Sequence, residues 1–177
     1  MYRGEKILLR AYKKEDIPLA WKYINDEEVK RYLTPGIPFP LTLEEEYKWF
    51  EGISSSSNNS YSFAIETLQE GKYIGGCGVN RVDWKNSIAD IGIFIGNGEF
   101  REKGYGTDAV KALIKFIFNE MNLNKIKLNV YSFNKRAIKC YEKCGFKVEG
   151  TLRQEIFREG KYHDEYIMSI LRCEYNS

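Results

Sequence analysis

The chain has 177 residues, enough for one domain with its own hydrophobic core, and its charges nearly cancel to a formal net of +2. That balance argues against a nucleic-acid partner or an anionic membrane surface, and no apolar run approaches the roughly 18 residues that a membrane span needs. The first residues lead directly into a strand-like segment, so we expect no signal peptide, a single domain over residues 1–177 and a cytoplasmic protein.

The first third of the chain predicts a strand, two helices and two loops. Apolar residues at helical spacing follow Glu15 and Asp16, and Thr42 with Glu45 matches the capping box of a second helix. Three of the four prolines lie together and predict a loop between the two helices. The segments are a strand at 7–10, a helix at 15–26, a loop at 34–40, a helix at 42–53 and a polar loop at 54–60.

The remainder predicts a strand meander followed by alternating helices and strands. In the third strand of the meander, apolar residues alternate with Asp90, Gly92 and Phe94, as in a strand with two different faces. Asn134 is placed to cap a helix that stops at Gly145. The segments are strands at 62–67, 73–80 and 88–96, a helix at 107–121, a strand at 126–130, a helix at 134–145 and a hairpin of 155–157 with 162–171. This order, with most strands antiparallel, predicts an α/β (α+β) fold with a mixed sheet.

The four cysteines predict reduced thiols rather than a metal site. Cys140 and Cys144 share a face of a predicted helix, whereas Cys77 and Cys173 lie in predicted strands. A zinc site would need paired CxxC or Cys/His clusters, and the one histidine is His163. We therefore expect no bound metal and mostly buried, reduced cysteines.

The turn at residues 101–106 has the properties of an anion site. Gly104 and Gly106 let the backbone approach a ligand closely and adopt positive φ. The helical turn that follows from Thr107 offers unpaired N–H groups at the positive end of a helix dipole, where diphosphate is the usual occupant. Arg101 adds a positive charge beside it.

Two other phosphate-binding designs fit this turn less well. A P-loop would end in Gly-Lys-Ser/Thr, and Gly106-Thr107 lacks the lysine. A G-x-G-x-x-A pattern does begin at Gly104, but Rossmann glycines follow their strand directly, whereas these stand eight residues beyond Gly96. The ribose-binding acid expected about 20 residues later is also missing, since residues 127–129 hold no carboxylate. The two glycines could also serve an ordinary tight connection from strand to helix that binds no ligand.

Two motifs and the end of the chain resemble the GNAT superfamily of N-acetyltransferases. Its acetyl-CoA signature is similar to Arg101-x-x-Gly104-x-Gly106, which lies after a strand and before a helix. Its second motif is similar to Asn134-x-x-Ala137-x-x-x-Tyr141-x-x-x-Gly145-Phe146. The closing segment 149–164 resembles the branch that contains ribosomal-protein N-terminal and spermidine acetyltransferases. The likeness therefore covers nearly the whole chain.

The resemblance implies a mostly antiparallel mixed sheet with flanking helices, in which two parallel neighbouring strands splay apart. These would be the strands that end at Gly96 and near Phe133. Acetyl-CoA would be the cofactor, with its pantetheine along the first of these strands like an added strand and its diphosphate on the glycine turn. The cofactor-binding residues would be Ile93, Phe94, Ile95, Arg101, Glu102, Lys103, Gly104, Tyr105, Gly106, Thr107 and Asn134.

The reaction that the resemblance implies is direct attack of an amine on the thioester. Tyr141 would protonate the departing thiolate, although the position also suits a tyrosine packed on its helix's apolar face. Asp90, on the cofactor-binding strand, is the first candidate for the general base, and Glu66 is the second. Asp90 could equally be a solvated carboxylate, and a water wire could replace a single base. A strand N–H near Ile93 would meet the developing negative charge.

The acceptor would be a primary amine: a protein N-terminus, a polyamine or another small amine. In this fold its pocket would be built from residues 25–50 and 157–164. Acidic runs at 26–28 and 44–46 would suit a polyamine or an aminoglycoside, but they are also typical of solvated helix faces. A non-catalytic module that binds CoA or a protein partner is the alternative. The resemblance further implies self-association as a homodimer.

Overall fold

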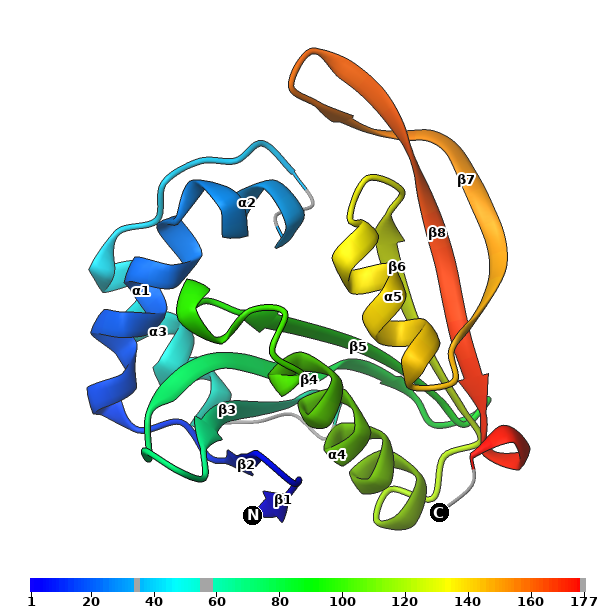
Figure 1. Cartoon of the computed structure of the whole chain (residues 1–177), viewed down its shortest axis with the longest axis horizontal. Coiled ribbons are helices and arrows are strands. Elements are labelled where there is room, and N and C mark those ends of the chain that lie inside the picture. Colours follow the sequence, from blue (N-terminus) through cyan, green and yellow to red (C-terminus); the bar gives the residue numbers. More distant parts are fainter. Residues whose placement is uncertain (34–35, 55–58, 176–177) are drawn as a thin grey trace.

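The computed structural model describes residues 1–33, 36–54 and 59–175, and consists of one sheet with helices on both faces (Figure 1). The strands are β1 (Tyr2–Arg3), β2 (Ile7–Arg10), β3 (Tyr61–Thr67), β4 (Tyr73–Asp83), β5 (Ile88–Ile95), β6 (Lys125–Tyr131), β7 (Lys147–Arg158) and β8 (Lys161–Leu171). The helices are α1 (Ile17–Asn25), α2 (Glu27–Leu33), α3 (Leu43–Ser54), α4 (Tyr105–Asn119) and α5 (Lys135–Lys143). The strand order is β1-β2-β3-β4-β5-β6-β8-β7, and among the described strands only β5 and β6 are parallel neighbours. The predicted mixed, mostly antiparallel sheet with flanking helices is confirmed.

Groups at the helix ends explain where three helices begin. The Glu45 N–H donates to Thr42 Oγ1 at 3.2 Å and the Thr42 N–H donates to the Glu45 carboxylate at 2.7 Å, so the capping box of α3 is confirmed. The Asn134 side chain accepts the Ala137 N–H at 3.2 Å and caps α5. α4 begins after Gly104, whose φ of 88° lies in the left-handed region that glycine adopts without strain.

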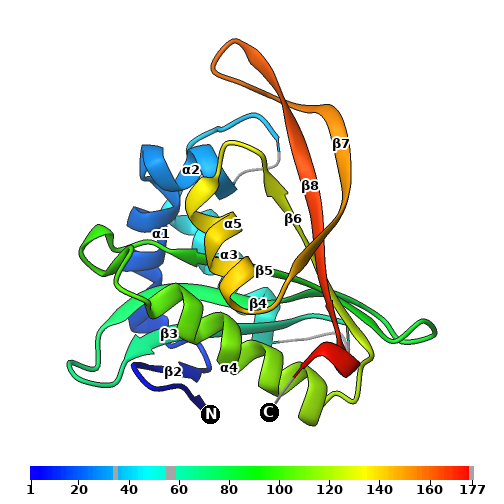
Figure 2. The ribbon, with the colours of Figure 1, turned by 45° about the vertical axis from the view of Figure 1, so that its right-hand side comes forward.

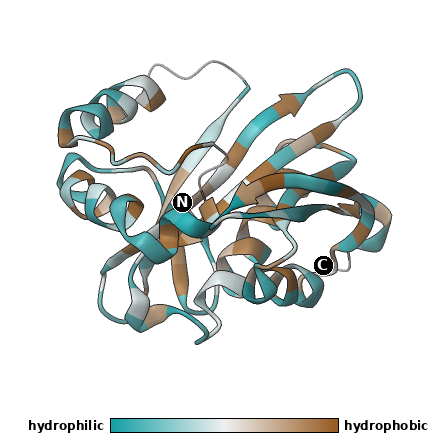
Figure 3. Ribbon diagram, turned by 90° about the horizontal axis from the view of Figure 1, so that it is seen from above, coloured by the Kyte–Doolittle hydropathy of each residue, from teal (hydrophilic) through white to brown (hydrophobic). Residues whose placement is uncertain are grey.

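The sheet separates two apolar clusters, because neighbouring residues of a strand face opposite sides. α4 packs its apolar stripe onto one face, where Ile65 and Ile91 are buried, and α5 contacts α4 beside it. α1 covers the other face, where Ala20 packs against Ala64 and Tyr73. Figure 3 shows apolar and polar residues alternating along the strands. One face of the sheet therefore packs against α4 and the other against α1.

β5 and β6 are paired at one end and diverge at the other (Figures 1 and 2). Their parallel register joins residues 88–90 with residues 125–127, and no later pair joins these two described strands. Yet β5 continues to Ile95 and β6 to Tyr131. Each strand stays in the sheet through its other neighbour, since β4 pairs with β5 up to Ile95 and β8 pairs with β6 along its length. The predicted splay of the parallel pair is confirmed.

Several segments differ from the expectation. α2 follows α1 directly, and the Asp26 side chain accepts the Val29 N–H at 3.1 Å near its start. β7 is far longer than residues 155–157, because it pairs with β8 through two register shifts. The four cysteines are free thiols, but Cys173 is exposed in a short 3₁₀ helix, and Cys77 alone is fully buried. Residues 34–35 and 55–58 of the predicted loops lie outside the described residues.

None of the described helices is long and apolar enough to cross a membrane.

Candidate active site

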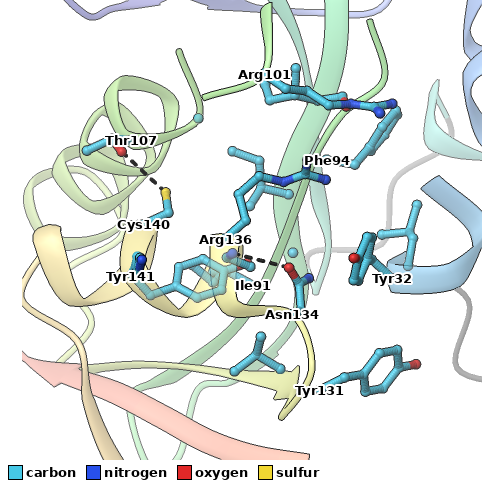
Figure 4. Close-up of a pocket in the computed structure, with 18 of the residues that line it drawn as sticks. Tyr32, Ile91, Phe94, Arg101, Thr107, Tyr131, Asn134, Arg136, Cys140 and Tyr141 are labelled. Atoms are coloured by element: carbon cyan, nitrogen blue, oxygen red, sulfur yellow. Dashed lines mark hydrogen bonds between the residues drawn. The ribbon is translucent and has the colours of Figure 1, made fainter. Parts of the chain in front are cut away.

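The diverging ends of β5 and β6 form one wall of a cavity of about 540 Å³. α5, α2 and the start of α4 supply the other walls, and Figure 4 shows Tyr141 of α5 and Tyr32 of α2 on opposite sides of the view. The volume lies within the usual range of small-molecule sites. We call this cavity the strand-gap cavity.

Neighbouring strands without a shared register leave backbone N–H and C=O groups on their facing edges. β5 has such an edge over residues 91–95, and β6 has one over residues 128–131. Buried backbone groups need partners, and an extended ligand that carries amides can supply them as an added strand would. Ile93, Phe94 and Ile95, the residues predicted to bind along β5, all line the strand-gap cavity.

The glycine turn closes one end of the cavity. Glu102 and Gly104 both adopt left-handed backbone conformations, with φ of 59° and 88°. Alternation of left- and right-handed residues turns successive amides toward one side, and the first N–H groups of an α-helix have no intrahelical partner. Glu102, Gly104, Gly106 and Thr107, which are among the residues predicted to bind the cofactor, line the cavity. The turn therefore presents backbone donors and a helix dipole to an anion.

Two predicted turn residues face elsewhere. Lys103 does not line the cavity, and its carbonyl accepts a hydrogen bond from Lys6 Nζ at 2.9 Å. The Tyr105 ring packs edge-on against Phe100, with ring centroids 5.1 Å apart. The Lys103 carbonyl and the Tyr105 ring thus hold the turn against the body of the protein.

Two arginines supply positive charge beside the turn. Arg101 donates from Nε to the Ile95 carbonyl at 3.0 Å and from Nη2 to the Gly96 carbonyl at 2.8 Å, which fixes its guanidinium at the end of β5. Arg136 of α5 also lines the cavity; the sequence reasoning missed it, although it lies inside the second motif. Glu28 of α2 forms ion pairs with both guanidiniums, at 2.8 Å from Arg136 Nη2. The predicted diphosphate site thus has two positioned cations.

Tyr141 and Cys140 of α5 line the cavity. Tyr141 is 6% exposed and packs against Phe146, and burial raises the pKa of its phenol above the ordinary value. Cys140 Sγ lies 3.4 Å from Thr107 Oγ1, and the Cys144 thiol donates to the Thr107 carbonyl at 3.6 Å. Both sulfur contacts tie α5 to the first turn of α4. The motif tyrosine and the glycine turn are therefore parts of one packed unit (Figure 4).

Asp90 lies where β5 and β6 separate. It is the last residue of β5 paired with β6, and it lines the cavity. Burial raises the pKa of its carboxylate, while Lys127, with Nζ 3.9 Å from Oδ2, and Arg81 oppose the rise. Asn129 and Glu165 line the same region from β6 and β8, and nothing in their local sequence marks them, because the sheet order places them there.

Glu66, the second candidate base, does not line the strand-gap cavity. Its carboxylate accepts from Arg10 Nε at 2.5 Å, and Arg10 also pairs with the buried Asp16 at 2.7 Å. Lys13 Nζ lies 3.8 Å away on the same oxygen. These ion pairs join β2, β3 and the start of α1, so the Glu66 carboxylate serves the fold and not the reacting centre.

The segments predicted to build the acceptor pocket meet at a second cavity of about 1030 Å³, between α1, α2 and β7. Its lining includes Glu27, whereas the neighbouring Asp26 and Glu28 pair with Arg101. Glu46 of the other acidic run is buried, with 5% exposure. The two acidic runs are therefore not simply solvated helix faces.

Comparison with known proteins identifies the family. Residues 6–147 match the family model of the GNAT acetyltransferase domain. The chain is 31% identical to the uncharacterised N-acetyltransferase p20 of Bacillus licheniformis, over 97% of this chain and 96% of that protein. It is 27% identical to the spermidine N(1)-acetyltransferase of Vibrio cholerae, over 97% and 96% of the two chains. The crystal structure of spermidine N-acetyltransferase from Vibrio cholerae in complex with CoA and spermine is similar with a TM-score of 0.85, at 27% identity over 95% of this chain and 96% of that one.

These matches agree with the cavity. The family model spans the glycine turn and the second motif, and the whole fold matches a protein that holds CoA. The predicted cofactor, acetyl-CoA, is therefore confirmed, and the relatives support acetyl transfer to an amine. The chain belongs to the GNAT acetyltransferase family and is an N-acetyltransferase that uses acetyl-CoA.

Proposed function

We propose that this protein transfers the acetyl group of acetyl-CoA to a primary amine of the polyamine class by direct attack of the amine on the thioester. The observation that supports this is the strand-gap cavity. It collects the glycine turn, Tyr141 and the carboxylate of Asp90 around the unpaired edges of β5 and β6.

The residues of the cavity fit acetyl-CoA. The edge of β5 over residues 91–95 suits the two amides of a pantetheine chain, and the glycine turn suits a diphosphate. Arg101 and Arg136 add positive charge near the turn. Asn134 lines the cavity at the start of α5, although its side-chain oxygen is engaged in capping that helix.

Asp90 serves as the general base in this proposal. Alkyl amines have pKa values near 10, so the attacking nitrogen must lose a proton before or during the reaction. An ordinary aspartate is a weak base, and the raised pKa of Asp90 brings its basicity closer to the working pH. Its place at the point where the strands separate puts it at the end of the cavity away from the glycine turn.

Tyr141 serves as the general acid. Bound acetyl-CoA supplies an acetyl group activated as a thioester. Burial raises the pKa of Tyr141, so its phenol is protonated at neutral pH, and it donates its proton through a positioned hydrogen bond to the sulfur that departs. A backbone N–H of β5 near Ile93 meets the negative charge that develops on the thioester oxygen.

The polyamine class is proposed because of the relatives. Two spermidine acetyltransferases, from Vibrio cholerae and Escherichia coli, are 27% and 28% identical over nearly the whole chain. A protein N-terminus is the other acceptor that the sequence leaves open. Self-association as a homodimer stays a prediction.

Tyr141→Phe tests the chemistry. Loss of the phenolic proton removes the general acid but leaves the ring, so we expect kcat to fall about a hundredfold. Acetyl-CoA affinity, measured by calorimetry, should stay within about twofold because a hydroxyl is lost and no wall is moved. Thiol release from acetyl-CoA with spermidine, and with Ala- or Ser-initial peptides, measures kcat and compares the two acceptor classes.

Tyr131→Phe is the matched control, since Tyr131 is a second buried tyrosine that lines the same cavity. It should keep kcat within about threefold, below the effect of a general acid. Equal kcat for wild type and Tyr141→Phe would remove the assignment. Faster turnover of the peptides than of spermidine would show that the acceptor is a protein N-terminus and not a polyamine.

A further inference from the structure

Four polar side chains from four adjacent strands line the strand-gap cavity at the end away from the glycine turn. They belong to β4, β5, β6 and β8, which are neighbours in the sheet. Asp90 and Asn129 alternate along their strands with Ile91 and Val130, which join the apolar cluster under α4. The polar side chains therefore point to the face that α4 does not cover. The four are Asn80, Asp90, Asn129 and Glu165.

At the end of the cavity away from the glycine turn, the charge of Glu165 has no cationic partner. The other carboxylate at that end, Asp90, lies 3.9 Å from the Lys127 amine. In the part of the chain that the structure describes, no Lys, Arg or His nitrogen forms an ion pair with Glu165. Asn129 Nδ2 donates to Glu165 Oε2 at 2.9 Å, which orients the carboxylate without neutralising it.

The surroundings of Glu165 favour a cation. The side chain is half-buried, and burial together with the charges of Glu155 and Asp90 raises the pKa of its carboxylate. Partial burial of an unpaired negative charge costs free energy that a bound cation recovers. One oxygen is oriented by Asn129, so the other can accept a hydrogen bond from a ligand. Glu165 thus suits an ammonium group that enters the cavity.

We propose that Glu165 is a specificity-determining residue that binds a second, protonated nitrogen of the acceptor, while Asp90 serves the nitrogen that reacts. The inference rests on the proposed function and assigns selection for a second positive charge to one side chain. Two carboxylates on neighbouring strands then divide two tasks, charge recognition and proton removal. Acceptors with one amine leave Glu165 unpaired and bind less tightly.

The test compares acceptors that differ by one ammonium group. Hexamethylenediamine and hexylamine have the same chain length, and spermidine serves as a natural polyamine. Removing one charged hydrogen bond with Glu165→Gln should raise KM for hexamethylenediamine and spermidine about tenfold. kcat, KM for hexylamine and KM for acetyl-CoA should each stay within about twofold, because none of them depends on the second charge.

Glu142→Gln is the matched control. Glu142 is exposed on α5 and lines neither the strand-gap cavity nor the second cavity. It should change KM for the diamine less than about twofold, as expected for an exposed charge. Glu165→Asp keeps the charge on a shorter side chain and should restore part of the preference for the diamine.

Two results would overturn the inference: an equal rise in KM for hexylamine and the diamine after Glu165→Gln, or no rise for either. Failure of the proposed function has a different signature. Wild-type protein would then bind acetyl-CoA in calorimetry yet release no thiol with any amine. In that case spermidine binding to the CoA-loaded protein still tests whether Glu165 binds a protonated nitrogen. Weaker spermidine binding by Glu165→Gln supports this role, and equal binding contradicts it.

Discussion

Gly106 leaves a space in the protein that a ligand can use. A Cβ atom there would lie 3.7 Å from Ile95 Cγ1 and 3.9 Å from Cys140 Sγ, both ordinary contact distances. Gly106 also lies in the first turn of α4, where alanine favours the helix. We expect Gly106→Ala to keep or slightly raise Tm and yet to raise KM for acetyl-CoA about tenfold, because the new methyl group enters the cavity.

Gly52→Ala is the control for Gly106→Ala. Gly52 lies exposed on α3, and a Cβ there would meet nothing within 4 Å. It should raise Tm in the same way and leave KM for acetyl-CoA unchanged. A loss of stability in Gly106→Ala, or an unchanged KM, would mean that the glycine serves the fold alone.

The base role of Asp90 makes a signed prediction about pH. Burial raises the pKa of its carboxylate above the ordinary 3.8, and the carboxylate must be ionised to accept a proton. Activity therefore falls as pH drops through that raised pKa. Lys127 opposes the rise, with Arg81 and Glu165 as the other charged groups nearby, so Lys127→Met should raise the pKa further and move the acid limb of kcat to higher pH.

Lys125→Met controls for the loss of a lysine from β6. Lys125 pairs with Glu149 at 2.7 Å, away from Asp90, so its replacement should leave the acid limb in place. Asp90→Asn should lower kcat about a hundredfold and remove the limb. An acid limb that stays fixed in Lys127→Met, or moves to lower pH, contradicts Asp90 as the base.

One carboxylate of α4 accepts hydrogen bonds from the start of the chain, beside the packing of Tyr2 on Phe116. Asp108 in its first turn accepts three backbone N–H groups, from Glu5 at 3.0 Å, Lys6 at 2.7 Å and Ile7 at 3.1 Å. The negative charge also lies at the favourable end of the helix dipole. We expect Asp108→Ala to lower the free energy of unfolding by about 2 kcal/mol, because the three donors lose a charged partner.

Urea unfolding measures this loss of free energy. An unchanged m value shows that the surface area exposed on unfolding is the same in the variant and the wild type. Asp108→Asn keeps one acceptor oxygen and should lose about half as much free energy. A loss below about 0.5 kcal/mol in Asp108→Ala, the range of ordinary surface changes, would show that water replaces the carboxylate.

Elements that the sequence predicts well differ in a physical way from those it does not. α4 has a continuous apolar stripe, and α5 has the Asn134 cap, so local pattern suffices for both. α2 has seven residues and buries only Val29, so its sequence lacks the apolar periodicity that predicts a helix. Its Glu28 pairs with Arg136 of α5, a partner that the local sequence does not indicate. β7 is mostly exposed and twice irregular in register, which removes the alternation that marks a strand.

At the scale of the whole molecule, the candidate site divides into what motifs encode and what topology brings together. The glycine turn and Tyr141 belong to motifs, and the sequence predicts both at the cavity. Glu165 reaches the cavity through the pairing of β8 with β6, which no local pattern records. Glu66 shows the converse, since its place on an earlier strand of the meander suggested a base, but its carboxylate pairs with Arg10. Residue type identifies candidates, and the sheet order decides between them.

The central claim is that the gap between β5 and β6 binds acetyl-CoA. A crystal structure of the protein with CoA tests it most directly. We expect pantetheine amides to pair with β5 beyond Asp90, the diphosphate to lie on the amides of residues 101–107, and the sulfur to lie within hydrogen-bond reach of the Tyr141 hydroxyl. CoA bound at another surface, with β5 and β6 unchanged and no ligand between them, would contradict the account.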